Sequence, residues 1–398
     1  MSTAPFPDVF RPAAGALPRR TYVALPGVEG ARVLVEAGAV VPARRVLAAL
    51  RPRTDAPAGA RGLARGVATE VGTLGVGVLG KVRPRHTTMD VAAGPDAIES
   101  YVARHLGRGR AEVAFGWRFG PPRANRKPVG CVVAEGGSVL AFVKVGVTPL
   151  TGRLVEAEGA ALARLGPRVG PLTLPGLLHR GRWQDLPVLV TAPLRHTGRR
   201  GGEPDRRAAA EIAVAGALGI RRESLRASAF WADVTQPADD PDPRWAPLRA
   251  ATRQVAAHAG GRDLVLGAWH GDWTAHNVVA TRAGIGAWDW ERFRDGVPAG
   301  FDPLHYRLMA ALESGAPRAD LVPDLVREAP RLLAHLGAAG LVEDPAMTAV
   351  LYLLTLARRY QRDGQDRTGS VAAGFADWLV DPLPAAVGSL VGRAGEVR

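Results

Sequence analysis

Residues 270–291, HGDWTAHNVVATRAGIGAWDWE, carry three oxygen-bearing side chains, Asp272, Asn277 and Asp289, at a spacing that suits phosphoryl transfer from a nucleotide. Asn277 stands five residues after Asp272. In a phosphoryl-transfer loop with an Asp and an Asn at this spacing, the Asp orients an acceptor hydroxyl and accepts its proton, while the Asn binds a Mg²⁺ ion. The spacing therefore predicts a catalytic Asp272 and a metal-binding Asn277.

A short hairpin is expected to return Asp289 to the side of Asn277. Residues 278–280 are an apolar, strand-like run, 282–286 supply turn residues, and 287–289 can pair back as a second strand. Mg²⁺ prefers an oxygen shell that one or two protein ligands share with water and nucleotide phosphates, and Asn277 with Asp289 would meet that need. The alternative is a surface loop in which these side chains only cap backbone groups.

The whole pattern, His-Gly-Asp with Asn five residues later and Trp-Asp-Trp-Glu closing the hairpin, resembles the aminoglycoside phosphotransferase and choline kinase superfamily. The resemblance implies a protein kinase-like fold, Mg²⁺ as cofactor, ATP or GTP as cosubstrate, and a bracing role for His270. The chain departs from the family pattern at 273–276, where many members have an aliphatic residue and a Pro-Gly pair. These positions face the acceptor in the family, so the acceptor-side candidates are Trp273, His276, Trp290 and Glu291.

A lysine in a strand is expected to contact the nucleotide phosphates. Lysine occurs only at positions 81, 127 and 144 among 51 basic residues, so a retained lysine can mark a site that needs a compact ammonium group. Lys144 lies near the end of the strand-like run 138–145, and the resemblance makes it the phosphate-contacting lysine. A helix over 151–165 follows and carries Glu156 and Glu158; one of them can pair with Lys144, and the family pattern fits Glu158 better.

Two further segments of this region are nucleotide-binding candidates. The loop 119–128 occupies the place of a phosphate-covering loop, lacks the G-x-G-x-x-G pattern, and could supply charge through Arg123 and Lys127 instead. A solvated basic loop is the alternative. The strand 186–190 runs into Thr191 and Ala192, which the resemblance makes the hinge whose backbone meets the purine ring. The choice between ATP and GTP does not follow from backbone contacts.

The expected fold class is α+β: a bilobal kinase-like chain with a small antiparallel-sheet N-lobe at 96–195 and a mostly helical C-lobe at 196–398. Before these lobes, residues 1–95 are expected to form a small separate α/β extension of unknown role, with strands at 20–25 and 31–36 and a helix at 42–50. Residues 61–84 read as a connector rather than a membrane-surface helix, because interior glycines weaken a helix. In the C-lobe we expect helices at 205–218, 243–259, 317–336, 344–362 and 374–390.

Composition limits the class of protein and of partner. A hydrophobic content of 47% suffices for a substantial core, no run of residues is long and apolar enough for a membrane span, and the N-terminus lacks an apolar signal core. Cys131 is the only cysteine, which fits a reducing cytoplasm and a buried structural thiol. The net charge of +13 favours an acidic acceptor, although an arginine-rich composition explains part of it.

The predicted reaction moves the γ-phosphoryl group of ATP or GTP to a hydroxyl on an acidic sugar, natural product or peptide. A second hypothesis is a catalytically weak, kinase-like regulatory protein that binds an anionic partner. The joint retention of Lys144, Asp272, Asn277 and Asp289 argues against it. Nucleic-acid binding is disfavoured because the basic residues lack interleaved aromatic residues. Asp302 resembles a family Asp whose role is usually structural.

Overall fold

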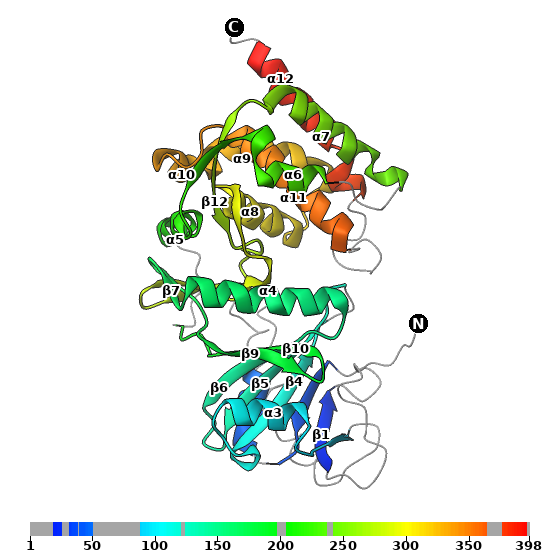
Figure 1. The fold of residues 1–398 in the computed structure, drawn as a ribbon, viewed down its shortest axis with the longest axis vertical. Helices are drawn as coiled ribbons and strands as arrows, with labels where there is room; N and C mark the ends of the chain where they lie inside the picture. The colour runs from blue at the N-terminus through cyan, green and yellow to red at the C-terminus, as the bar shows by residue number, and fades with distance from the viewer. Residues whose placement is uncertain are drawn as a thin grey trace. The chain divides into compact units, whose positions relative to one another are not determined.

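The computed structural model describes residues 19–25, 32–38, 40–50, 88–120, 124–196, 204–236, 242–363 and 376–395. These residues divide into two compact units. The first comprises described residues within 1–121, 125–160 and 175–193, and the second comprises those within 122–124, 161–174 and 194–398. The first is rich in sheet and the second in helix (Figure 1), so the predicted α+β class is confirmed.

The first unit is built on one eight-stranded antiparallel sheet with the order β3-β1-β2-β4-β5-β6-β10-β9. Its strands are β1 (Arg19–Leu25), β2 (Val33–Glu36), β3 (Thr88–Ala92), β4 (Val113–Phe119), β5 (Pro128–Ala134), β6 (Val139–Val145), β9 (Leu177–Trp183) and β10 (Leu186–Thr191). Buried and less buried residues alternate along much of β6, as expected for a strand that packs its apolar side chains on a core.

Helices cover the two faces of this sheet. On one face α1 (Val40–Ala49) buries Ala43 and Val46 against a cluster that includes Cys131. On the other, α3 (Ile98–His105) packs Ile98 and Val102 into a cluster with Trp117 (Figure 1). Helices therefore cover part of each face of the sheet, while the edge strand β9 keeps alternate residues exposed.

The described strands of residues 1–95 do not form a separate unit. β2 pairs with β4, with Val33 opposite Arg118 and Val35 opposite Gly116, and β1 pairs with both β2 and β3. The expectation of a separate extension is thus corrected: backbone pairing with β4 continues the sheet of the N-lobe through these strands. The predicted connector at 61–84 lies outside the described residues.

The second unit is mostly helical around one apolar core. Its helices are α5 (Pro204–Gly216), α6 (Ala229–Thr235), α7 (Ala246–Ala259), α8 (Phe301–Glu313), α9 (Leu321–Leu332), α10 (Ala334–Ala338), α11 (Pro345–Asp363) and α12 (Leu383–Gly395). Residues 347–358 of α11 are buried throughout, so this helix forms the centre of the core. No helix among the described residues is long and apolar enough to cross a bilayer.

Two predicted helices are shorter than expected. The helix predicted over 317–336 is divided at Leu333, whose φ of −101° and ψ of 6° end α9 and begin α10. The segment predicted as a helix over 374–390 is divided: a π-helical segment spans Ala376–Val380, and α12 begins at Leu383, directly after Pro382. A residue before proline is disfavoured in the α region, which explains the later start.

Two small sheets position the loops of this unit. One has the order β11-β12-β15, formed by β11 (Arg221–Ser224), β12 (Asp263–Trp269) and β15 (Arg294–Pro298). The other has the order β13-β14-β8-β7, formed by β7 (Arg168–Val169), β8 (Leu172–Thr173), β13 (Val278–Thr281) and β14 (Gly284–Ala287). The residues predicted to be catalytic follow β12 and flank the β13–β14 hairpin.

Candidate active site

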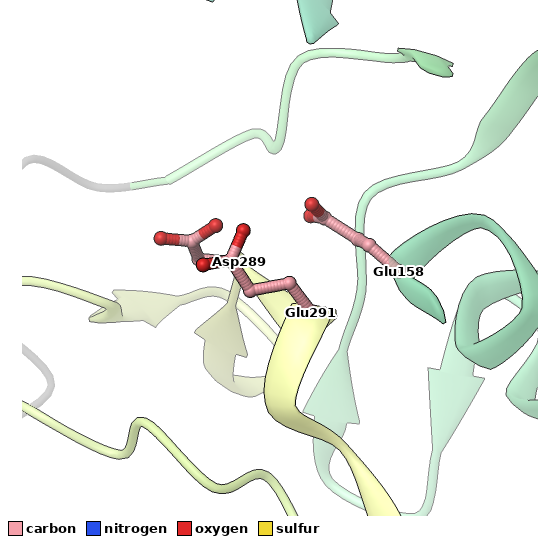
Figure 2. A group of neighbouring side chains, drawn as sticks. All are labelled: Glu158, Asp289 and Glu291. Carbon is pink, nitrogen blue, oxygen red and sulfur yellow. The ribbon is translucent and has the colours of Figure 1, made fainter. Parts of the chain in front are cut away.

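In the first unit Lys144 and Glu158 form a close ion pair. Lys144 Nζ lies 2.5 Å from Glu158 Oε2, and their side chains are only 15% and 2% exposed. Glu158, which is labelled in Figure 2, lies on α4 (Pro149–Leu165). Thr151 anchors the start of this helix, because its Oγ1 accepts hydrogen bonds from the backbone N–H groups of Val147 and Thr148.

The second candidate carboxylate on α4 has a different partner. Glu156 pairs with Arg182 at 2.7 Å, and both side chains are more than half exposed. An exposed pair of this kind contributes little to stability, whereas a buried carboxylate can fix the position of an ammonium group. The geometry therefore favours Glu158 as the partner of Lys144.

The other nucleotide-binding candidates of this unit differ in their exposure and hydrogen bonds. Thr191 is nearly buried at the end of β10. The N–H of Ala192 donates to the carbonyl of Gly176 at 2.7 Å, so this hinge donor is already used within the protein. Lys127 is partly exposed just before β5. Arg123 lies outside the described residues.

In the second unit the His-Gly-Asp segment follows β12 in a sharp turn that only glycine fits. Gly271 has a φ of +82°, and a Cβ at this position would lie 2.3 Å from the carbonyl oxygen of Arg292. Both the positive φ and the close backbone approach exclude a larger residue. Gly271 therefore sets the direction in which Asp272 leaves the strand.

Two buried side chains hold this turn. Asp302, in the first turn of α8, accepts hydrogen bonds from the backbone N–H of His270 at 2.8 Å and of Gly271 at 3.2 Å. Burial raises the pKa of Asp302 to about 7 although both amide donors oppose the shift. The structure thus gives Asp302 the bracing contacts that the resemblance implies.

His270 braces the same turn from its side chain. Its Nε2 lies 3.0 Å from the carbonyl of Trp288, and its Nδ1 accepts the N–H of Asp272 at 3.2 Å. Burial lowers the pKa of His270 to about 4, so the ring is neutral near pH 7, with its proton on Nε2. A neutral ring with both nitrogens engaged supports the loop and does not transfer protons.

Asp272 is an ionised carboxylate held by two donors. Asn277 Nδ2 donates to Asp272 Oδ2 at 2.8 Å and to its backbone carbonyl at 2.9 Å. His305 Nε2 lies 3.3 Å from Oδ1. Desolvation alone would raise the pKa, but the hydrogen bond from His305 and the charge of Arg359 outweigh it and lower the pKa of Asp272 to about 2.

Three residues that the sequence did not single out support this carboxylate. His305, on α8, is 1% exposed, and its Nδ1 lies 2.8 Å from the hydroxyl of Tyr352 on α11. Burial lowers the pKa of His305, so the neutral ring gives its Nε2–H to Asp272 and accepts from Tyr352. Arg359 on α11 donates to the carbonyl of Gly271 at 2.6 Å. No local pattern marked them, because α8 and α11 bring them together only through packing.

The predicted hairpin is present and carries two carboxylates. Val278 pairs with Ala287, and the N–H of Trp288 donates to the carbonyl of Asn277 at 3.2 Å, so Asn277 adjoins the residue before Asp289. Asp289 has a φ of 71°, and it and Glu291 each offer a carboxylate oxygen within 4.8 Å of the other (Figure 2). Carboxylate oxygens brought this close could be drawn together around a hard divalent cation such as Mg²⁺.

The acceptor-side expectations need correction. Trp273 is fully buried and Trp290 is 1% exposed, with the Trp290 indole N–H donating to the carbonyl of Ala287 at 2.9 Å. Both rings pack edge-on against His270, so they belong to the core under the loop and cannot line an acceptor site. Glu291 is also buried and adjoins Asp289, which suits a metal ligand better than an acceptor contact. The side chain of His276 is 42% exposed, and its Nε2 lies 3.1 Å from Glu313 Oε1.

No protein-family model matches the chain. No curated protein matches it either. Solved structures do. A thermostable mutant of an aminoglycoside phosphotransferase in its apo form is 15% identical, with a TM-score of 0.48 over 74% of this chain and 100% of that one. Choline kinase LicA from Streptococcus pneumoniae is 15% identical, with a TM-score of 0.39 over 66% of this chain and 89% of that one.

A third matching structure is amicoumacin kinase hAmiN in complex with AMP-PNP, Ca²⁺ and Ami. It is 12% identical, with a TM-score of 0.43 over 74% of this chain and 94% of that one. All three likenesses are remote, with TM-scores below 0.5, and the assignment of each site residue rests on the contacts described above.

Proposed function

We propose that the protein is a phosphotransferase that moves the γ-phosphoryl group of ATP or GTP to an acceptor hydroxyl. The observation that carries the proposal is the state of Asp272: an ionised carboxylate, fixed by Asn277 and His305, on a turn that Gly271 and Asp302 brace. A fixed carboxylate with a low pKa suits a group that orients a hydroxyl and accepts its proton late in a loose transition state.

The first unit supplies a group for the phosphates. Lys144 is held by Glu158 at 2.5 Å, so its ammonium is positioned before a nucleotide binds. A positioned cation stabilises phosphate oxygens without the cost of ordering a flexible side chain. Lys144 would bind the nucleotide phosphates, and Glu158 would keep its ammonium in place.

The carboxylates after β14 would hold the metal ion. Asp289 and Glu291 offer oxygens within 4.8 Å of each other, and Asn277 adjoins the same hairpin. When bound, Mg²⁺ would neutralise phosphate charge. Asp289 and Glu291 would fix it, and Asn277 could add its side-chain oxygen, because it holds Asp272 through its amide nitrogen.

The experiment that tests the function measures transfer directly. The protein is incubated with Mg²⁺ and ATP or GTP against a panel of acidic sugars, sugar phosphates and peptides that carry a hydroxyl, and products are read by mass. A gain of one phosphoryl group by an acceptor, absent in Asp272→Asn, supports the proposal. Nucleotide binding without transfer to any acceptor, and without slow nucleotide hydrolysis, would favour a regulatory protein with a kinase-like fold.

A further inference from the structure

The second unit contains a cavity of about 250 Å³ lined by arginines. Its walls come from α6, the end of β12, the segment around β15, and α11. Among the described residues, five guanidinium groups line it, from Arg292, Arg294, Arg358, Arg359 and Arg362, against three carboxylates. The lining side chains therefore carry two more positive than negative charges.

Two of the three carboxylates, Asp233 and Asp363, are held by three of these arginines. Asp233 accepts hydrogen bonds from Arg294 at 2.6 Å and from Arg362 at 2.9 Å. Arg292 pairs with Asp363 at 2.6 Å. Burial alone would raise the pKa of Asp233, but Arg294 and Arg362 lower it. The cavity thus already binds one carboxylate of its own through two guanidinium groups, which is the geometry of an oxyanion site.

The hydrogen bonds of the other two arginines go to neutral groups. Arg358 is only 6% exposed; its Nε donates to the carbonyl of Val234 at 3.0 Å and its Nη1 to Gln361 Oε1 at 2.7 Å. Burial and the charges of Arg362 and Arg249 lower the pKa of Arg358, although the charge of Asp233 opposes the shift. A buried cation beside a second cation is costly unless an anion offsets the charge.

The cavity adjoins the catalytic loop. Arg359 lines it and donates to the carbonyl of Gly271, the residue before Asp272. Trp269, which precedes His270, also lines it. A molecule anchored in the cavity would therefore have its other end close to the Asp272 carboxylate.

We propose that this arginine-lined cavity binds an oxyanion group of the acceptor, a phosphate, sulfate or carboxylate, and so selects acidic acceptors. The proposal rests on the proposed function, which it deepens by naming the acceptor class. The oxyanion of the acceptor would offset the excess positive charge of the arginines. The rest of the acceptor would extend from the cavity and place its hydroxyl beside Asp272.

Binding of inorganic anions tests the proposal without any turnover. Sulfate, phosphate and acetate are titrated into the full chain saturated with AMP-PNP, and binding is read by calorimetry and by the NMR signals of the arginine Nε–H groups. We expect saturable binding, with shifts at Arg358 and Arg359. No anion binding in the presence of AMP-PNP, or binding that does not saturate, would overturn the proposal.

Variants locate the anion. Asp233→Asn removes the internal competitor and should tighten sulfate binding about threefold or more, while Arg362→Gln should weaken it by a similar factor. Arg331→Gln is the matched control, because Arg331 is 74% exposed on α9 and does not line the cavity. If a thermal melt shows that one of these variants does not fold, Arg294→Gln is measured in its place. The side chain of Arg294 is 37% exposed.

The two proposals can fail separately. If the anion binds as expected but no acceptor is phosphorylated, the proposed function is wrong and the anion site stands. If an acceptor is phosphorylated but sulfate affinity is the same in wild type, Asp233→Asn and Arg362→Gln, the cavity does not select the acceptor. Equal turnover of an acidic acceptor and its neutral analogue would contradict the proposal in the same way.

Discussion

Replacing His305 by Phe should raise the pKa of Asp272. His305 gives its Nε2–H to Asp272 Oδ1 at 3.3 Å, and this interaction helps to lower the pKa of Asp272 from 3.8 to about 2 against the effect of burial. Desolvation acts upward, so without the His305 hydrogen bond the pKa of Asp272 should rise. Arg359 would still lower it, and the charge of Asp289 would still raise it.

The shift can be measured by carbon NMR of the carboxyl groups during a pH titration, with Asp272→Asn to assign the signal. In wild type the Asp272 carboxylate stabilises the fold at pH above 3.8, and this contribution is lost as the pH falls to about 2. In His305→Phe the acid limb of the transfer rate should move to higher pH. Tyr352→Phe is the control, because it keeps the His305 contact. A pKa that stays near 2 in His305→Phe would refute the role assigned to His305.

Four further predictions follow from individual contacts. Gly271→Ala should lower the free energy of unfolding by at least about 1–2 kcal/mol and abolish turnover, because its φ is +82° and its Cβ would lie 2.3 Å from a carbonyl oxygen; an unchanged denaturation midpoint would contradict this. Lys144→Met should weaken ATP binding about tenfold or more in a calorimetric titration, since it removes the cation that Glu158 positions. Asp289→Ala should raise the Mg²⁺ concentration that gives half-maximal turnover, whereas an unchanged Mg²⁺ dependence would place the metal elsewhere. Cys131, fully buried with its pKa raised by burial to about 12, should react with a thiol reagent only after unfolding.

The local sequence pattern was sufficient to predict the strands and the hairpin that carry the candidate site residues. The alternation along β6 placed Lys144, and the turn residues at 282–286 predicted the β13–β14 hairpin that adjoins Asp289. Pairing across the sheet could not be predicted in the same way. The strands of residues 1–95 join β4 through backbone hydrogen bonds, which carry no sequence signal of their own.

Burial was the property that the sequence could not supply. Trp273 and Trp290 stand beside the catalytic residues in the chain, yet packing turns both rings into the core beneath the loop. His305 and Tyr352 are far from Asp272 in the chain and reach it only because α8 and α11 pack together. A histidine on a buried helix face is common in any core, so its role becomes visible only from its contacts.

The most direct test of the account compares wild type with Asp272→Asn in one calorimetric and one turnover measurement. Asparagine keeps the size of the side chain but removes the ionised oxygen that would take the proton of the acceptor hydroxyl. The account predicts an unchanged affinity for ATP, which it assigns to Lys144, and loss of phosphoryl transfer by about 10²-fold or more. Transfer at the wild-type rate in Asp272→Asn would contradict it.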